Sequence, residues 1–314
     1  MRYLVSGGAG FLGTNLCIRL LREGHEVVAL DDLSSGTEDN LKKLKEFGGF
    51  GFTLHDIVRP LPDVGKVDYV YNLACPASPP RYQRDPVQTF RTSVWGAWNI
   101  LQYASKENVP VFHTSTSEVY GDPLEHPQAE TYWGHVNPIG ARACYDEGKR
   151  AAETLLFDFA RKTGLEIKVV RIFNTYGPHM DPDDGRVVSN IITQALAGKP
   201  VTIHGNGRQT RSFCYVDDLM DGFGRMEKMP KDFAGPVNLG NPQERTVLEL
   251  VKEVEKEIGA PIEIRYRPLP QDDPKRRKPD ISLAKEKLGW GPKTPLPEGI
   301  RRTVSYFRGL PGRR

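Results

Sequence analysis

The chain has 314 residues, and its 43 lysines and arginines against 40 aspartates and glutamates leave a formal net charge of +3. So small a charge does not favour a protein that binds nucleic acid through a uniformly basic surface. The four cysteines are isolated, without CxxC pairs or histidines at metal-ligand spacing, so we expect neither a metal site nor a disulfide framework.

The first apolar segment, Tyr3 to Ser6, follows Met1 almost directly and leaves no room for a signal peptide. No run approaches the roughly 20 apolar residues that a membrane helix needs. We therefore expect a cytoplasmic protein without a membrane partner.

The first predicted unit is a strand, a glycine-rich turn and a helix. The strand covers 3–6, the turn has the sequence GGAGFLG, and apolar residues recur at helical spacing through 14–22. Gly7, Gly10 and Gly13 allow a tight turn, close approach of backbone amides to a pyrophosphate, and close packing of the helix on its strand. This context predicts a dinucleotide site.

A second strand, 25–30, ends at Asp31 and Asp32. A carboxylate at this distance from the glycines accepts hydrogen bonds from an adenosine ribose and repels a 2′-phosphate, so NAD is favoured over NADP. The alternative is that these aspartates only cap the next helix. A third strand, 52–54, ends at His55 and Asp56, where contact with adenine is expected.

The fourth predicted strand, 67–73, ends in small residues that let a cofactor lie against the backbone. The proline-rich segment CPASPPRY, 75–82, follows it. It is either a rigid connector or a wall of the substrate pocket.

A fifth strand, 109–112, precedes a cluster of hydroxyl groups and Glu118. Tyr145 and Lys149 are four residues apart, which places both on one face of a helix. A phenol titrates near pH ~10, so it needs a nearby cation to act as a base at neutral pH. We expect Lys149 to supply that charge and Thr116 or Ser117 to share the proton, although such spacing also occurs by chance.

Two predicted helices, 87–105 and 145–161, are apolar on more than one side. Each therefore needs a second partner besides the sheet. They could pair with their copies in a homodimer, as a four-helix interface, or be covered by loops of the same chain.

A sixth strand, 167–173, completes the pattern of a doubly wound parallel sheet of the Rossmann type. Beyond Pro178 the strands become short, in VTIH, FCYV, PVNLG and IEIRYR. We expect a dinucleotide-binding domain over 1–178 and a smaller α/β substrate lobe over 179–314, with some chain crossing back. Loop arginines of this lobe could dock a diphosphate; they are Arg186, Arg208, Arg211, Arg267 and Arg277.

Together, GGAGFLG, STSE, the pair Tyr145 and Lys149, and HGNGRQTRSF resemble the extended short-chain dehydrogenase/reductase family that acts on nucleotide sugars. The resemblance covers essentially the whole chain. Within that family, several long segments are similar to those of the UDP-glucuronate decarboxylases, also called UDP-xylose synthases; they are CPASPPRY, TSTSEVYGDPLEHP, YWGHVNPIGARACYDEGKR, RIFNTYGP, DDGRVVSN, QTRSF and RKPDIS.

This resemblance implies that NAD+ takes hydride from C4 of UDP-glucuronate while Tyr145 takes the hydroxyl proton. Lys149 is then the activator and ribose ligand, and Thr116 the hydroxyl partner. The 4-ketone makes the C6 carboxylate that of a β-keto acid, so carbon dioxide leaves. Protonation at C5 and reduction by the same NADH then give UDP-xylose.

The resemblance also implies roles for further residues. Ser117 and Glu118 lie beside the sugar, and Arg277 lies near the carboxylate or the C5 proton. The implied cofactor-binding residues are Gly7, Gly10, Phe11, Leu12, Asp31, Asp32, Ser35, Gly36, Asp56, Ile57, Leu73, Ala74, Thr92, Thr114, Tyr145, Lys149 and Thr175. The implied substrate-binding residues are Pro79, Arg81, Tyr82, Glu118, Asn174, Arg186, Val188, Arg211 and Arg277.

Three alternatives share parts of this pattern. A UDP-glucuronate 4-epimerase would keep the carboxylate, and a nucleotide-sugar 4,6-dehydratase would carry an aspartate where this chain has Ser117. A non-catalytic NAD-binding protein would have no need for an activated phenol.

Overall fold

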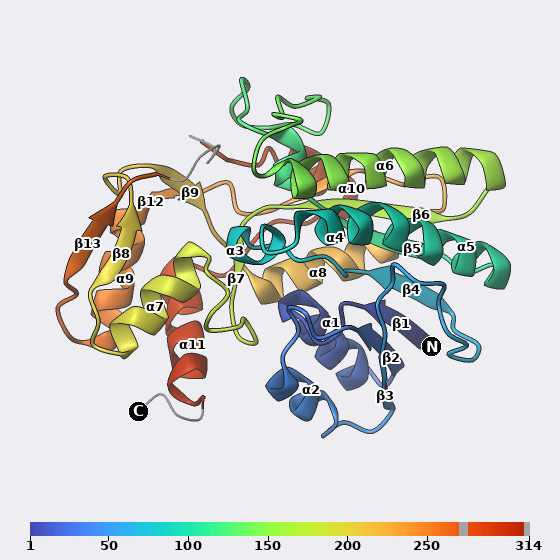
Figure 1. Cartoon of the computed structure of the whole chain (residues 1–314), viewed down its shortest axis with the longest axis horizontal. Coiled ribbons are helices and arrows are strands. Elements are labelled where there is room, and N and C mark those ends of the chain that lie inside the picture. The colour runs from blue at the N-terminus through green and yellow to red at the C-terminus, as the bar shows by residue number, and fades with distance from the viewer. Residues whose placement is uncertain (270–275, 311–314) are drawn as a thin grey trace.

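The computed structural model describes residues 1–269 and 276–310. Seven parallel strands form the central sheet in the order β11-β6-β5-β4-β1-β2-β3 (Figure 1). Their bounds are β1 (Arg2–Ser6), β2 (Glu26–Asp31), β3 (Phe50–Leu54), β4 (Tyr69–Asn72), β5 (Val111–Thr116), β6 (Ile167–Ile172) and β11 (Val237–Leu239). The predicted doubly wound parallel sheet is confirmed. Its strand order reverses between β1 and β4, where such sheets open a crevice at the carboxyl ends.

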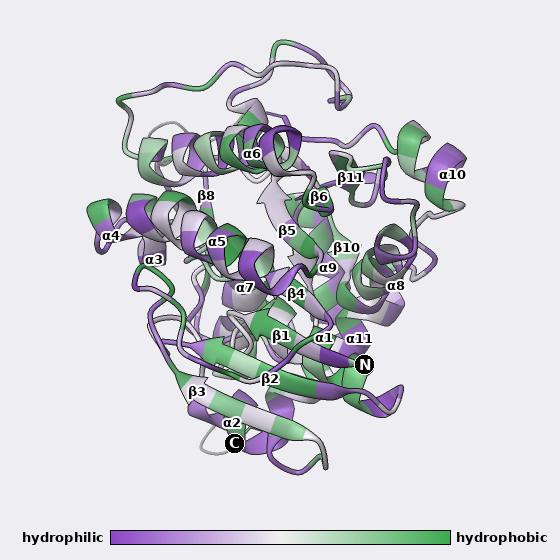
Figure 2. Ribbon diagram, turned by 90° about the vertical axis from the view of Figure 1, so that its right-hand side faces the viewer, coloured by the Kyte–Doolittle hydropathy of each residue, from purple (hydrophilic) through white to green (hydrophobic). Residues whose placement is uncertain are grey.

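Successive residues of a strand point to opposite faces of the sheet, and both faces are buried. Tyr3 and Val5 of β1 belong to one apolar cluster, whereas Leu4 belongs to the other. Hydrophobic residues accordingly run through β1 and β2 (Figure 2). The strands are therefore continuously apolar rather than alternating.

Helices cover both faces of this sheet (Figure 1). One layer contains α1 (Phe11–Arg22), α2 (Glu38–Leu44) and α8 (Val216–Glu227). The other contains α4 (Pro86–Arg91), α5 (Ala97–Glu107) and α6 (Ala143–Thr163). The predicted single helix over 87–105 is interrupted by a π-helical turn, η1 (Thr92–Gly96), between α4 and α5. Such turns are frequent at functional sites.

The segment PVNLG corrects the sequence prediction. It was expected among the short strands of the smaller lobe, but β11 pairs with β6 at the edge of the main sheet, with Val237 opposite Val170. Val237 and Leu239 are fully buried there. The edge of the main sheet is covered on both faces and therefore accommodates these apolar side chains. A strand of three residues is too short for its periodicity to indicate the sheet to which it belongs.

The remaining elements lie largely to one side of the sheet (Figure 1). β8 (Val201–His204) pairs with β13 (Ile264–Arg267) near α7 (Val187–Leu196), α9 (Val247–Ile258) and α11 (Leu296–Arg308). The other short elements are α3 (Pro79–Tyr82), η2 (Ser117–Tyr120), β7 (Thr175–Tyr176) paired with β10 (Cys214–Tyr215), β9 (Thr210–Ser212) paired with β12 (Glu244–Thr246), and α10 (Ser282–Leu288). α10 packs on β11, so the chain returns to the main sheet after β13.

Within residues 1–269 and 276–310, no helix combines the length and the apolar character needed to cross a membrane. The four cysteines are free thiols, and Cys17 and Cys214 are buried.

Candidate functional site

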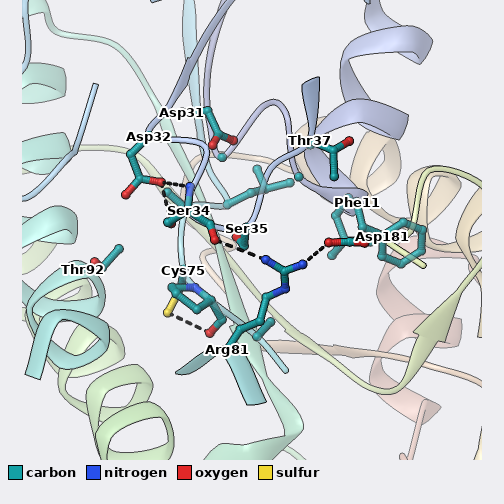
Figure 3. A pocket seen from close by; sticks show the side chains of 18 of the residues that line it. Phe11, Asp31, Asp32, Ser34, Ser35, Thr37, Cys75, Arg81, Thr92 and Asp181 are labelled. Atoms are coloured by element: carbon teal, nitrogen blue, oxygen red, sulfur yellow. Dashed lines mark hydrogen bonds and ion pairs between the residues drawn. The ribbon is translucent and has the colours of Figure 1, made fainter. Parts of the chain in front are cut away.

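A cavity of about 850 Å³ opens at the carboxyl ends of β1, β2 and β4 (Figure 3). Twelve of the predicted cofactor-binding residues line it: Gly7, Gly10, Phe11, Leu12, Asp31, Asp32, Ser35, Asp56, Ile57, Leu73, Ala74 and Thr92. The cavity therefore lies at the strand-order reversal, where the glycine-rich turn and the ends of three neighbouring strands meet.

The glycine-rich turn leaves the first turn of α1 facing this cavity. A Cβ on Gly7, which has φ +73°, would lie 2.9 Å from the backbone of Ala74, and a Cβ on Gly13 would lie 2.0 Å from the carbonyl oxygen of Gly7. The helix begins at Phe11 without a side-chain cap and without an acidic residue in its first turn. Its amide groups and dipole therefore suit a pyrophosphate.

Asp31 fixes the glycine-rich turn from the end of β2. Its carboxylate accepts hydrogen bonds from the amides of Ala9, at 2.9 Å, and Leu33, at 2.8 Å. Burial raises the pKa of this carboxyl, and the two amide bonds oppose the shift. Asp32 is exposed and accepts from the amide and hydroxyl of Ser34, so the two aspartates lie in different environments.

Arg81 crosses the mouth of the cavity (Figure 3). Its guanidinium forms an ion pair with Asp181 and donates to the carbonyl oxygen of Ser34 at 3.3 Å. CPASPPRY thus forms part of the wall of the cavity that contains the glycine-rich turn. Its contact with a substrate stays a prediction.

The predicted catalytic residues come together beside this cavity. Thr116 ends β5, Tyr145 lies in the first turn of α6, and the two side chains are hydrogen-bonded. Lys149 is buried one turn further along α6 and donates to the carbonyl oxygen of Thr114 at 2.9 Å. The helical spacing therefore places both side chains as the sequence predicts.

The electrostatics of Tyr145 differ from the expectation. Burial raises the pKa of its phenol well above the ordinary value, while the hydrogen bond with Thr116 and the charge of Arg186 act in the opposite direction. Burial also lowers the pKa of Lys149, whose ammonium is directed at a backbone carbonyl. Burial is the largest cause for both groups, so the pKa values of the phenol and of the ammonium are each shifted toward the neutral form.

Tyr82 packs against Tyr145. Its ring stacks on that of Tyr145, with centroids 5.1 Å apart and an interplanar angle of 3°. It is only 1% exposed, and its hydroxyl has no hydrogen-bond partner among the described residues. The ring therefore orients Tyr145 through packing.

Glu118 is bound by two guanidinium groups. Arg142 donates to Oε2 at 2.5 Å, and Arg277 forms an ion pair with Oε1. Burial raises the pKa of this carboxyl, but the charges of Arg277 and Arg142 outweigh it and bring the pKa down to about 2. Glu118 is therefore an anion at neutral pH.

Asp146 lies next to this pair and behaves differently. Its Oδ2 lies 3.9 Å from Nε of Arg142. Burial, followed by the charge of Glu118, raises its pKa to about 8, against the opposing charges of Arg142 and Arg277. The two carboxyl groups thus hold different charges at neutral pH.

The other predicted residues lie on neighbouring elements. Arg186 lines the cavity and lies 5.6 Å over the ring of Phe11. Val188 is buried in the core through α7, and Asn174 binds the amide of Cys214 through its backbone oxygen. Ser117 is buried at the start of η2. It does not line the cavity, and neither do the remaining predicted residues, which are Gly36, Thr114, Thr175, Pro79, Arg208, Arg211 and Arg267.

Sequence reasoning missed Arg142, Asp146 and Asp181. The spacing of Arg142 and Asp146, four residues apart at the start of a helix, was a usable signal for an ion pair. Asp181 pairs with a residue 100 positions away, so no local pattern indicated it.

Residues 3–240 match the NAD dependent epimerase/dehydratase family. The chain belongs to this family. UDP-glucuronic acid decarboxylase 5 of Arabidopsis thaliana is 52% identical over 98% of the chain and 89% of its own length. UDP-glucuronic acid decarboxylase 1 of Xenopus tropicalis is 48% identical over 98% of the chain and 72% of its own length.

Solved structures of the family include UDP-glucuronic acid 4-epimerase from Bacillus cereus in complex with UDP-glucuronic acid and NAD. It has a TM-score of 0.87 and 27% identity, and the match covers 98% of this chain and 99% of the other. NAD is the cofactor of the present chain, and the residues fit it: the cavity, the close approach of Gly7 to Ala74, and the uncapped start of α1 together accommodate a dinucleotide.

Proposed function

We propose that this protein is a UDP-glucuronate decarboxylase that forms UDP-xylose and carbon dioxide. Two relatives with that activity in their names are about 50% identical over nearly the whole chain. The observation that carries the proposal is a buried guanidinium, Arg277, paired with Glu118 beside Tyr145 and Thr116. A cation is needed there because the substrate carries a carboxylate and the intermediate is an enolate.

Proton transfer at the C4 hydroxyl is the first task of the chain's residues. When bound at the glycine-rich turn and the start of α1, NAD would supply the acceptor for the hydride of C4 and the source of its return. Tyr145 takes the hydroxyl proton, and its hydrogen bond with Thr116 favours the phenolate. Since burial raises the pKa of this phenol, proton removal is coupled to hydride loss rather than completed beforehand.

Loss of carbon dioxide requires no additional electron sink. In the 4-keto sugar, the C5–C6 bond breaks, its electron pair enters the ketone as an enolate, and the carboxylate leaves as carbon dioxide. Arg277 stabilises first the carboxylate and then the enolate charge. A proton added at C5 and hydride returned to C4 complete UDP-xylose, with Tyr145 returning the proton to the oxygen.

The binding of the nucleotide sugar involves the elements after Pro178. We propose that residues 179–314 form mainly the substrate lobe, with α8, β11 and α10 returning to the sheet. Asn174 and Arg211 would contact the diphosphate, and Arg186, next to the cavity, would contact substrate and orient Tyr145. Free thiols suit a cytoplasmic setting.

We also propose a homodimer through α4, α5 and α6. Trp95 and Trp98 are 51% and 43% exposed on this surface. The ring of Trp98 meets that of Phe159 of α6 edge-to-face, with the ring centroids 5.9 Å apart. Trp95 lies in η1 and Trp98 at the start of α5, so the two exposed rings are grouped on consecutive turns of the chain and support a contact with a second copy.

Incubation with UDP-glucuronate and catalytic NAD tests the reaction. We expect one carbon dioxide per substrate consumed and a product with the mass of UDP-xylose. Formation of UDP-galacturonate without carbon dioxide would instead support the 4-epimerase, the activity of the Bacillus cereus neighbour.

A further inference from the structure

Arg142 lies where two separate parts of the site meet. Its guanidinium donates to Oε2 of Glu118 at 2.5 Å and lies 5.9 Å over the ring of Tyr82. That ring in turn stacks on Tyr145. Arg142 thus contacts the carboxylate of the site directly and the catalytic phenol through one intervening ring.

The two arginines that bind Glu118 use different oxygens of its carboxylate. Arg142 occupies Oε2, and Arg277 occupies Oε1. Either guanidinium can therefore leave without displacing the other, and the remaining one still holds a charge-assisted hydrogen bond.

The two arginines differ in how they are held. Arg142 directly precedes α6, a helix of 21 residues, and is 8% exposed between Tyr82 and Asp146. Arg277 belongs to an extended segment that pairs with Gln128, and it also donates to the carbonyl oxygen of Gly121 at 3.0 Å. Nε of Arg277 has no hydrogen-bond partner within 1–269 and 276–310.

We propose that Arg142 is a positioning residue that retains Glu118 while Arg277 transfers from Glu118 to the carboxylate of the substrate. The proposal rests on the function proposed above, because it assigns that carboxylate to Arg277. Without Arg142, Glu118 would compete for Arg277, since a buried carboxylate needs a partner. Arg142 therefore sets how readily the site accepts a carboxylate-bearing sugar.

Arg142→Met is the direct test. We expect kcat/KM for UDP-glucuronate to fall about 10- to 100-fold, the range for a hydrogen bond to a charged group, mainly through a higher KM. Binding of UDP-glucose, which has no carboxylate, is expected to change less than about 3-fold. Arg161→Met, on the exposed end of the same helix, is the matched control and retains both values.

The double variant separates positioning from a general structural effect. If Arg142 acts through Glu118, adding R142M to E118Q lowers kcat/KM for UDP-glucuronate little further than E118Q alone, because the effects of coupled residues are not additive. Arg142→Lys keeps the positive charge but loses the planar guanidinium, so its kcat/KM for UDP-glucuronate should lie between those of the wild type and R142M. NAD content and thermal unfolding confirm that each variant is folded.

Three results would overturn the inference: unchanged kinetics in R142M, an equal loss in the wild-type and E118Q backgrounds, or an equal loss of UDP-glucose binding. Failure of the proposed function looks different, because the wild-type protein would then release no carbon dioxide from UDP-glucuronate.

Discussion

Glu118 and Asp146 share Arg142 as a neighbour, yet their environments move their pKa values in opposite directions. For Glu118, the charges of two guanidinium groups outweigh the rise in pKa that burial causes. Asp146 has only one guanidinium nearby, at 3.9 Å, and the negative charge of Glu118 raises its pKa further. Direct hydrogen bonds to the charged form make the difference. The pKa values of these two neighbouring carboxyl groups are therefore shifted in opposite directions, that of Glu118 toward the anion and that of Asp146 toward the protonated acid.

Asp146→Asn should stabilise the protein increasingly as the pH rises. The folded-state pKa of about 8 lies above the ordinary value of 3.8, so between them the folded state holds a proton that the unfolded state has lost. The free energy of unfolding of the wild type therefore falls by roughly 2–4 kcal/mol between pH 4 and pH 8. The asparagine variant does not titrate at this position and lacks that fall. Urea unfolding at both pH values measures it. Parallel pH profiles would contradict the prediction.

Tyr145→Phe removes one hydroxyl and keeps the ring that stacks on Tyr82. We expect carbon dioxide release to fall about 100- to 10,000-fold, the usual contribution of an acid–base group, because no group then accepts the C4 hydroxyl proton. NAD remains bound, which its absorbance after denaturation measures. Full activity in this variant would exclude Tyr145 as the base.

At the scale of elements, the β1–α1 unit depends on close backbone approach. Gly13→Ala would place a Cβ 2.0 Å from the carbonyl oxygen of Gly7, so the turn must shift. We expect about 1–3 kcal/mol less stability and weaker NAD binding, because overpacking strains the turn that faces the pyrophosphate. Thermal unfolding and NAD titration measure both effects.

Gly48→Ala is the control for this prediction, because no atom lies within 4 Å of a Cβ at that position. If the two variants had the same stability and bound NAD equally well, α1 would not need its close contact with the turn.

At the scale of the whole molecule, Arg81 of α3 joins two distant segments that line the cavity, through its ion pair with Asp181 and its hydrogen bond to Ser34. Arg81→Ala should release NAD about 3- to 10-fold faster, the expected worth of a partly exposed ion pair. Stopped-flow displacement of NAD measures the rate. Arg91→Ala, on the exposed end of α4, should leave it unchanged.

Asp181→Asn should speed NAD release as much as Arg81→Ala does, because either change breaks the same pair. An effect of Arg81→Ala alone would assign the role to the guanidinium rather than to the ion pair.

The proposed dimer interface of α4, α5 and α6 depends on apolar contacts of Trp98. Trp98→Glu should give a monomer by light scattering, because a carboxylate cannot be buried between the helices. Tyr266→Glu, at a 56% exposed tyrosine of β13 on the opposite side of the molecule from α5 (Figure 1), should remain dimeric. A wild-type monomer at micromolar concentration would refute the interface.

Some features of this protein depend on residues close together in the chain, and others on residues far apart. The glycine spacing and the four-residue separation of Tyr145 and Lys149 are local patterns, and the helix and turn that they predict are present. The π-helical turn and the placement of β11 were not predictable, because each depends on neighbours distant in the chain.

By itself, the sequence determined the parallel α/β fold, the dinucleotide turn and the identity of the chemical groups, because apolar periodicity and glycine positions act over a few residues. Which groups meet, and which of them are charged, depends on the folded chain. Arg142, Glu118 and Arg277 are brought together from three separated segments, and burial sets the protonation of Tyr145 and Asp146. Desolvation and charge pairing depend on three-dimensional distance, which no local pattern encodes.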